Sequence, residues 1–246
     1  MMPDWLLALF FVAIAFTYAS VGFGGGSSYL AILAVAGLPF QEIRLTALLC
    51  NIIVVSGGTF IFFQNKQLDV RKILPLVAIS IPAAFLGAKM RISQETFYML
   101  LGGSLLVASA LLWLQPQKQE ADSVASPQPV RDGLLGGGIG LLSGMVGIGG
   151  GIFLSPLLHF FRWDTARKIA ATASVFILVN SLSGIAGQLA HRPTDLHWNR
   201  IALLGAAVLA GGQAGSRISL SYFNPLLIRR LTAVLVFLAG LEVLTK

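Results

Sequence analysis

Charge is scarce in this sequence. Only 11% of the 246 residues are Asp, Glu, Lys or Arg, whereas 56% are hydrophobic. A soluble globular domain carries about 25% charged residues, so this composition excludes an ordinary soluble fold. Uncharged runs extend from Trp5 to Gln41 and from Gly133 to Phe161. These and most of the other uncharged runs approach or exceed the roughly 20 residues of a spanning helix, so we expect an all-α polytopic membrane protein.

Cysteine and acidic residues are also few. The single cysteine, Cys50, excludes a disulfide framework and a thiolate metal cluster. The 10 acidic residues fall almost entirely between the apolar runs, where we expect loops, and cations such as Arg44 are expected in loops too. A carboxylate in mid-membrane would mark a cation path or a proton relay. Its absence disfavours a cation pump and favours a small anion as the substrate.

Motifs for nucleotide binding and for catalysis are missing as well. Ser27 and Ile152 stand where a GxGxxG motif requires glycine, and no P-loop lysine follows either glycine string. No histidine is placed to activate a serine, and no set of side chains predicts a metal centre or another cofactor. The 17 basic residues are scattered rather than gathered on one face. The sequence therefore predicts neither an enzyme nor a partner of nucleic acid.

What the sequence does contain is a repeated glycine string. VGFGGG begins at Val21 and VGIGGG begins 125 residues later, at Val146. At the same offset Ser56 falls on Ser181, and between the copies lies a polar stretch rich in Gln, Ser and Pro that is typical of a linker. The sequence thus predicts three parts: a first membrane repeat over 1–114, a polar linker over 115–132 and a second membrane repeat over 133–246.

Each glycine string interrupts an apolar run that is too long for one helix. Residues 5–41 would extend about 55 Å as a single helix, whereas the hydrocarbon core is about 30 Å thick. The chain must turn back or break, and glycine tolerates such a break, which must be buried in protein or line a watery cavity. We expect each repeat to hold a glycine-broken helix pair plus three transmembrane helices, about 8 to 10 membrane segments in all.

The number of crossings sets how the two repeats are related. A broken pair that returns to its starting side, followed by three crossings, gives each repeat an odd number of crossings. Two such repeats in succession are inverted relative to each other. Inverted repeats with paired broken helices are typical of a secondary transporter, with its site near the midplane. We expect alternating access by movement of one half against the other.

The candidate substrate-binding residues follow from this architecture. Helices that begin at the glycine strings would direct free N–H groups and positive dipole ends at an anion, although close helix packing is an alternative role for such glycines. Buried hydroxyls and amides nearby would complete the site. The predicted set comprises Gly24, Gly25, Gly26, Ser27, Asn51, Ser56, Gly149, Gly150, Gly151, Asn180 and Ser181.

The two glycine strings, together with the segments ALLCNIIVVSGG and TASVFILVNSLSG that follow them, resemble the TauE/SafE family, often called sulfite exporters. The resemblance covers essentially the whole chain. It implies secondary transport, in the direction of export, of small sulfur-containing anions such as sulfite, thiosulfate or an organosulfonate. It also implies a multi-pass protein of the bacterial inner membrane, whose partners are the anion and the lipid bilayer. By motif position, it places substrate contacts at Gly24 to Ser27 and at Gly149 to Gly151.

Two other functions are compatible with part of this sequence pattern. An anion channel would contain the same broken helices but would need a continuous open pore. A membrane scaffold that transports nothing would use the glycines for helix packing alone.

Overall fold

The computed structural model describes residues 2–20, 24–115, 125–126, 128–190, 196–217 and 225–245. These residues form ten helices and contain no strand. The helices are α1 (Asp4–Ser20), α2 (Gly26–Val35), α3 (Phe40–Gln64), α4 (Val70–Lys89), α5 (Gln94–Leu114), α6 (Pro129–Val146), α7 (Gly151–Phe160), α8 (Ala166–Leu189), α9 (Trp198–Arg217) and α10 (Pro225–Leu244).

Several helices begin where the sequence supplies capping residues or proline. The Asp69 carboxylate accepts a hydrogen bond from the Lys72 N–H at the start of α4, and Ser93 caps α5 in the same way. Pro39 precedes α3 and Pro129 opens α6. Proline suits these positions because the N–H groups at a helix start have no partner within the helix.

Four of the described helices, α3, α4, α5 and α8, are long and apolar enough to cross a membrane. Large hydrophobic side chains project from the outside of the bundle, among them Phe63 (69% exposed), Met99 (63%) and Leu134 (71%). Their exposure would be costly in water and is expected in lipid, where apolar side chains face hydrocarbon. The chain is therefore a multi-pass membrane protein.

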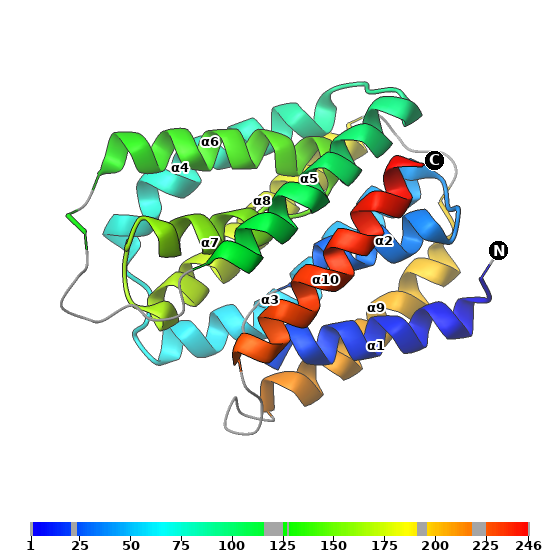
Figure 1. Ribbon diagram of the computed structural model, residues 1–246, viewed down its shortest axis with the longest axis horizontal. Helices are drawn as coiled ribbons and strands as arrows, with labels where there is room; N and C mark the ends of the chain where they lie inside the picture. The colour runs from blue at the N-terminus through cyan, green and yellow to red at the C-terminus, as the bar shows by residue number, and fades with distance from the viewer. Residues whose placement is uncertain are drawn as a thin grey trace.

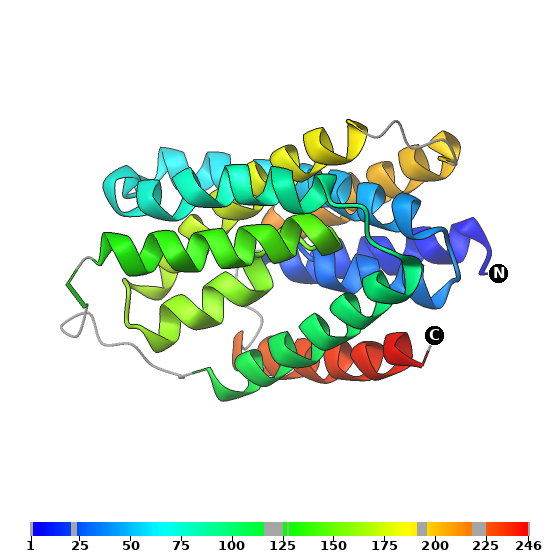
Figure 2. The same ribbon diagram turned by 90° about the horizontal axis from the view of Figure 1, so that it is seen from above.

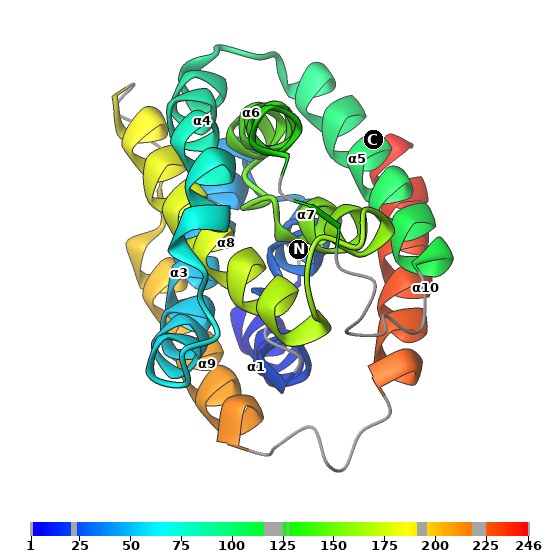
Figure 3. The same cartoon turned by 90° about the vertical axis from the view of Figure 1, so that its left-hand side faces the viewer.

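The helices form three layers, which are visible when the molecule is viewed along its long axis (Figure 3). Helices α6 and α7, and with them α1 and α2, occupy the middle layer. Helices α3, α4, α8 and α9 cover one side of it, through the pairs α4–α6, α1–α9, α2–α3 and α7–α8. Helices α5 and α10 cover the other side, where they contact α7 and α2 respectively. The short helices α2 and α7 are thus enclosed by longer ones.

The contacts between helices come in matching sets. Helices α1 to α5 correspond in order to α6 to α10. Under this correspondence the contacting pair α4–α6 matches α9–α1, the pair α4–α8 matches α9–α3, and the pair α5–α7 matches α10–α2. Helix α1 begins at one end of the molecule and runs inward, and α2 runs back towards that end. Helix α6 begins at the opposite end and runs inward, and α7 runs back towards that opposite end (Figures 1 and 2). The chain therefore breaks at both glycine strings, as predicted.

Glycines outside the two strings serve close helix packing. Along α6, Gly136, Gly140 and Gly144 face the backbone of α4, and a methyl group on Gly140 would lie 2.6 Å from the Ser80 carbonyl oxygen. On α9, Gly211 and Gly215 face the backbone of α1 in the same manner. Small residues at this spacing let membrane helices approach until their backbones touch.

Candidate functional site

The two breaks have the same backbone design. Gly25 and Gly150 are the N-cap residues of α2 and α7, and their φ angles of 78° and 84° are left-handed. Only glycine adopts this conformation without strain. Each of these helices has 10 residues. Because the first N–H groups of a helix have no partner in the preceding turn, both breaks direct N–H groups and a positive dipole end towards the interior.

The two breaks touch each other in the middle of the molecule. A methyl group added to Gly26, at the start of α2, would lie 2.6 Å from the carbonyl oxygen of Ile148 in the second string. That carbonyl accepts a hydrogen bond from Asn51 Nδ2 at 2.9 Å. Residues that are about half the chain apart thus form one contact, with an α3 side chain between them.

Asn51 lies against both glycine strings. A methyl group on Gly24 would lie 2.5 Å from Asn51 Oδ1, and one on Gly149 would lie 2.6 Å from Asn51 Nδ2. The side chain is 1% exposed. Within the described part of the chain, Asn51 Oδ1 has no hydrogen-bond partner. A buried amide oxygen without a donor is costly, and it marks a place where a ligand or water can supply the missing partner.

Ser181 joins this cluster from α8. Its Oγ would lie 3.1 Å from a methyl group on Gly149. The residue is fully buried, and no described residue forms a hydrogen bond with its hydroxyl. The structure therefore brings together Gly24, Gly26, Asn51, Gly149 and Ser181 from the predicted set.

Asn180, although adjacent to Ser181, is held elsewhere. Its Nδ2 donates to Ser80 Oγ on α4 at 3.1 Å and to the Phe176 carbonyl at 2.8 Å. These bonds fix it at the packing interface between α8 and α4 rather than on a glycine string.

Three predicted glycines contribute backbone but face apolar side chains. A methyl group on Gly25 would meet Ile14 at 3.0 Å, one on Gly150 would meet Phe176 at 2.7 Å, and one on Gly151 would meet Ile177. Ser27 is buried in the first turn of α2. These residues shape the breaks, and the helix-start N–H groups of Ser27 and Gly151 lack acceptors within their own helices.

Ser56 lies apart from the other predicted residues. It is exposed on α3, and its hydroxyl donates to the Ile52 carbonyl at 2.6 Å. This bond to the preceding turn is the usual arrangement for serine in a membrane helix. Ser56 and Ser181 therefore occupy matching positions in the sequence but different surroundings in the structure.

Arg44 is a residue that sequence reasoning placed wrongly. It was expected in a loop, but it belongs to the second turn of α3 and is only 5% exposed. Its Nη2 donates to the carbonyls of Gly144 at 2.9 Å and Ala88 at 3.3 Å. The prediction failed because the uncharged run was taken as the extent of the helix. Pro39, which precedes α3, was the signal that could have extended it.

Glu42 also lies inside the fold rather than in a loop. It is fully buried in the first turn of α3. Its carboxylate pairs with Arg200 Nη1 at 3.1 Å and with His197 Nδ1 at 2.9 Å, and Arg200 also pairs with Asp4 at 2.8 Å. This cluster ties the starts of α1, α3 and α9 together at one end of the molecule.

A second charged cluster is centred on Asp164, which lies just before α8. Asp164 pairs with Lys72 Nζ at 2.6 Å and with Lys168 Nζ at 3.7 Å. Burial alone would raise the pKa of Asp164. The hydrogen bonds from Lys72 and the Thr165 N–H, with the charges of Lys72 and Lys168, act in the opposite direction and bring the pKa below its ordinary value. Asp164 is therefore an ionised anchor between α4 and the start of α8.

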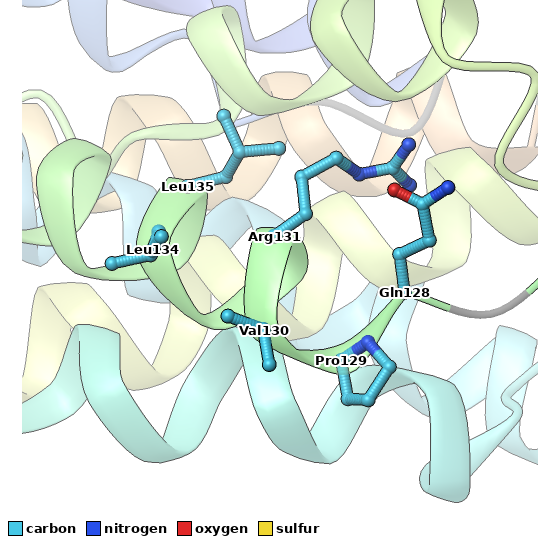
Figure 4. Close-up of a pocket in the computed structure, with 6 residues that line it drawn as sticks. All are labelled: Gln128, Pro129, Val130, Arg131, Leu134 and Leu135. Atoms are coloured by element: carbon cyan, nitrogen blue, oxygen red, sulfur yellow. The ribbon is translucent and has the colours of Figure 1, made fainter.

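A surface pocket of about 620 Å³ lies away from the glycine strings. It is formed by residues on and just before the first turns of α6 (Figure 4), at the far end of that helix from Gly147. Between the breaks, in contrast, the backbones of Gly26 and Ile148 lie in close contact. The pocket is lined by Gln128, Pro129, Val130, Arg131, Leu134 and Leu135.

Comparisons with known proteins identify the family to which the chain belongs. The family model for "Sulfite exporter TauE/SafE" matches residues 6–243. The chain is 34% identical over 244 residues to the probable membrane transporter protein y4hK of Sinorhizobium fredii, and the match covers 97% of both chains. It is 25% identical over 120 residues to the probable membrane transporter protein MamO of Magnetospirillum gryphiswaldense, covering 48% of this chain and 19% of that protein. No solved structure matches the chain.

Proposed function

Because the chain belongs to the sulfite exporter TauE/SafE family and is therefore a multi-pass membrane transporter, we propose that it carries small sulfur-containing anions out of the cell. Sulfite, thiosulfate or an organosulfonate would be the substrate, and the bacterial inner membrane its location. Both the family and the relative that matches over the full length are named for transport rather than for catalysis. The observation that carries the proposal is that the positive ends of α2 and α7 meet at Asn51.

The architecture we propose is a pair of inverted repeats, α1 to α5 and α6 to α10. Two observations support it: the helix contacts survive exchange of the two sets, and α1 and α6 enter from opposite ends (Figure 1). In such a fold the site lies at the repeat interface near the midplane, and the protein opens to each side in turn.

The proposed site lies between the glycine strings. The N–H groups at the starts of α2 and α7 and the Ser181 hydroxyl would donate to the anion, while the Asn51 amide can both donate and accept. The anion would replace the contact between Gly26 and Ile148 and separate the two breaks. Because dipoles and neutral donors supply the binding groups, the site would select for negative charge without a carboxylate or a metal ion.

A carrier fits the closed contact better than an open channel does. Transport measurements in proteoliposomes test this directly, with radiolabelled sulfite and thiosulfate, and with chloride as the comparison anion. We expect uptake of the sulfur anions that accelerates when unlabelled substrate is present on the opposite side. Uptake that responds only to the gradient, without this acceleration, would indicate a channel. Absence of any sulfur-anion flux would contradict the proposed substrate class.

Substitutions in both breaks test the site. Gly25→Leu and Gly150→Leu each place a large side chain at a left-handed N-cap, so we expect loss of substrate-dependent thermal stabilisation and of flux while the protein still inserts in the membrane. Normal flux in both variants would remove the site from between the breaks.

A further inference from the structure

Arg44 lies on the same face of α3 as Asn51. The two residues are seven positions apart, which is two helical turns or about 10 Å along the axis. The second glycine string follows α3 over this distance: a methyl group on Gly147 would lie 3.0 Å from Arg44 Cα, and the Ile148 carbonyl accepts from Asn51. One continuous contact therefore leads from Arg44 to the proposed site.

The guanidinium of Arg44 is buried without a carboxylate partner among the described residues. It donates from Nη2 to the Gly144 and Ala88 carbonyls, which lie in the last turns of α6 and α4. The negative ends of those helices offset part of the charge. Within the described chain, however, Arg44 Nε has no acceptor although it is shielded from solvent. A buried cation with an unused donor is expensive unless a partner arrives.

We infer that Arg44 is a second anion-binding group of the transporter, between the site at Asn51 and the end of the molecule where α3 begins. The inference rests on the proposed function. An anion with two oxygens on one sulfur atom would accept from Nε and, in exchange for one of the two carbonyls, from Nη2, which lies on the same side of the guanidinium as the Nε–H. In the absence of substrate, the two helix-end carbonyls hold the side chain in place.

This second binding group exists in one half only. The residue that corresponds to Arg44 at the 125-residue offset is Ile169, an apolar residue of α8 that is fully buried. The substrate therefore meets a fixed positive charge on one side of the central site and none at the matching position on the other side. Binding from the end where α3 begins is assisted by this charge, and binding from the opposite end is not.

Ligand affinity of Arg44→Gln tests the inference. We would measure the dissociation constants of sulfite and thiosulfate for the purified protein by calorimetry, with the neutral analogue dimethyl sulfone as a probe of shape alone. We expect R44Q to weaken binding of both anions by about tenfold or more, because a hydrogen bond to a charged group is lost. Lys72→Gln is the matched control: it also removes a cation that joins the two halves, but far from the glycine strings. It should lower the melting temperature and leave both dissociation constants unchanged.

The outcomes separate failure of the proposed function from failure of the role inferred for Arg44. If the wild-type protein binds neither sulfur anion, the proposed function fails and the role of Arg44 fails with it. If the wild type binds and R44Q loses only thermal stability, Arg44 is a helix cap and the inference alone is overturned. If R44Q does not fold, Arg44→Lys decides. Lysine keeps the charge but lacks the paired donors, so affinity for thiosulfate should fall at least about threefold, and unchanged affinity overturns the inference.

Discussion

The first and second glycine breaks have the same backbone conformation at their N-cap residues but are surrounded by different side chains. Both begin a 10-residue helix after a left-handed glycine. Around them, the first half supplies Asn51 and Arg44, whereas the corresponding residues of the second half are Phe176 and Ile169, and all four are buried. Of these four residues, Asn51 is the one that lies against described glycines of both strings.

The backbone and the side chains therefore make different contributions to the proposed site. The repeated backbone supplies two helix starts whose N–H groups converge, which requires only glycine at the breaks. In the proposed site, the side chains that would orient a substrate come mainly from α3 of the first half. The second half contributes the Ser181 hydroxyl, while its Phe176 ring packs against Gly150. The proposed site is therefore a single asymmetric one rather than two equivalent ones.

The largest effect is expected at Asn51. Asn51→Leu keeps the branched shape of the side chain but removes the bond to the Ile148 carbonyl, and it leaves that buried acceptor without a partner. We expect flux to fall by about tenfold or more, measured in proteoliposomes. Phe176→Leu is the control at the matching position of the other half, and it should lose some stability through the cavity it leaves but retain flux. Equal loss of flux in the two variants would mean that the halves contribute alike.

The two N-cap glycines should behave alike. Gly25→Ala and Gly150→Ala force a residue with a Cβ atom into the left-handed region, at a cost of about 1–2 kcal/mol each in the free energy of unfolding. Both also crowd neighbouring rings, of Tyr29 and Phe176 respectively. Melting temperatures should fall to a similar extent in both. Gly103→Ala, in α5 where a methyl group meets nothing within 4 Å, should be neutral or stabilising. A fall in only one break would show that their backbones are not equivalent.

A smaller effect is expected from the matched serines. Ser181→Ala removes an unpaired, buried hydroxyl beside Gly149, and should weaken substrate binding by about fivefold with little change in melting temperature. Ser56→Ala removes a hydroxyl that bonds only to its own helix and should change neither quantity. Calorimetric titration of the two variants side by side checks this. Weaker binding in S56A would return Ser56 to the site.

The smallest effect concerns the charged anchor at Asp164. The pKa of Asp164 is lowered in the folded protein, so its ionised form stabilises the fold. This contribution is present above the ordinary aspartate pKa of about 4 and is lost as pH falls through the lower folded value. Asp164→Asn should therefore melt earlier than the wild type at pH 7, with a difference that shrinks as pH falls below about 4. A difference that stays constant over that range would exclude the ion pair as its source.

The broken helices could be predicted from the sequence because length and composition determine them. An uncharged run from Trp5 to Gln41 exceeds a membrane span, and glycine is where it can turn. The start of α3 could not be predicted in the same way, because charges were treated as helix ends. Glu42 pairs with Arg200 on α9, and Arg44 donates to carbonyls of α6 and α4, and only the folded chain supplies these partners. The burial of a charged residue can be predicted from a sequence only when the partner that offsets its charge is known.

Only part of the predicted set lies together in the structure, for a similar reason. Residue type and repeat position pointed to Asn51, Gly149 and Ser181, which the structure brings together. The same reasoning treated Ser56 and Asn180 as equivalent to them. Their separation depends on which face of α3 or α8 turns inward, and helices with apolar residues on all sides carry almost no periodic signal for that.

The glycine contacts along α6 and α9 have a mechanical consequence. Where Gly144 meets the backbone of α4 and Gly215 that of α1, no side chain lies between the helices that could slide or repack. We therefore expect each of these helix pairs, α4–α6 and α1–α9, to move as a unit, and each joins a helix of the first proposed repeat to a helix of the second. If the protein opens to each side by alternating access, as we propose, the parts that move would therefore each contain helices from both proposed repeats.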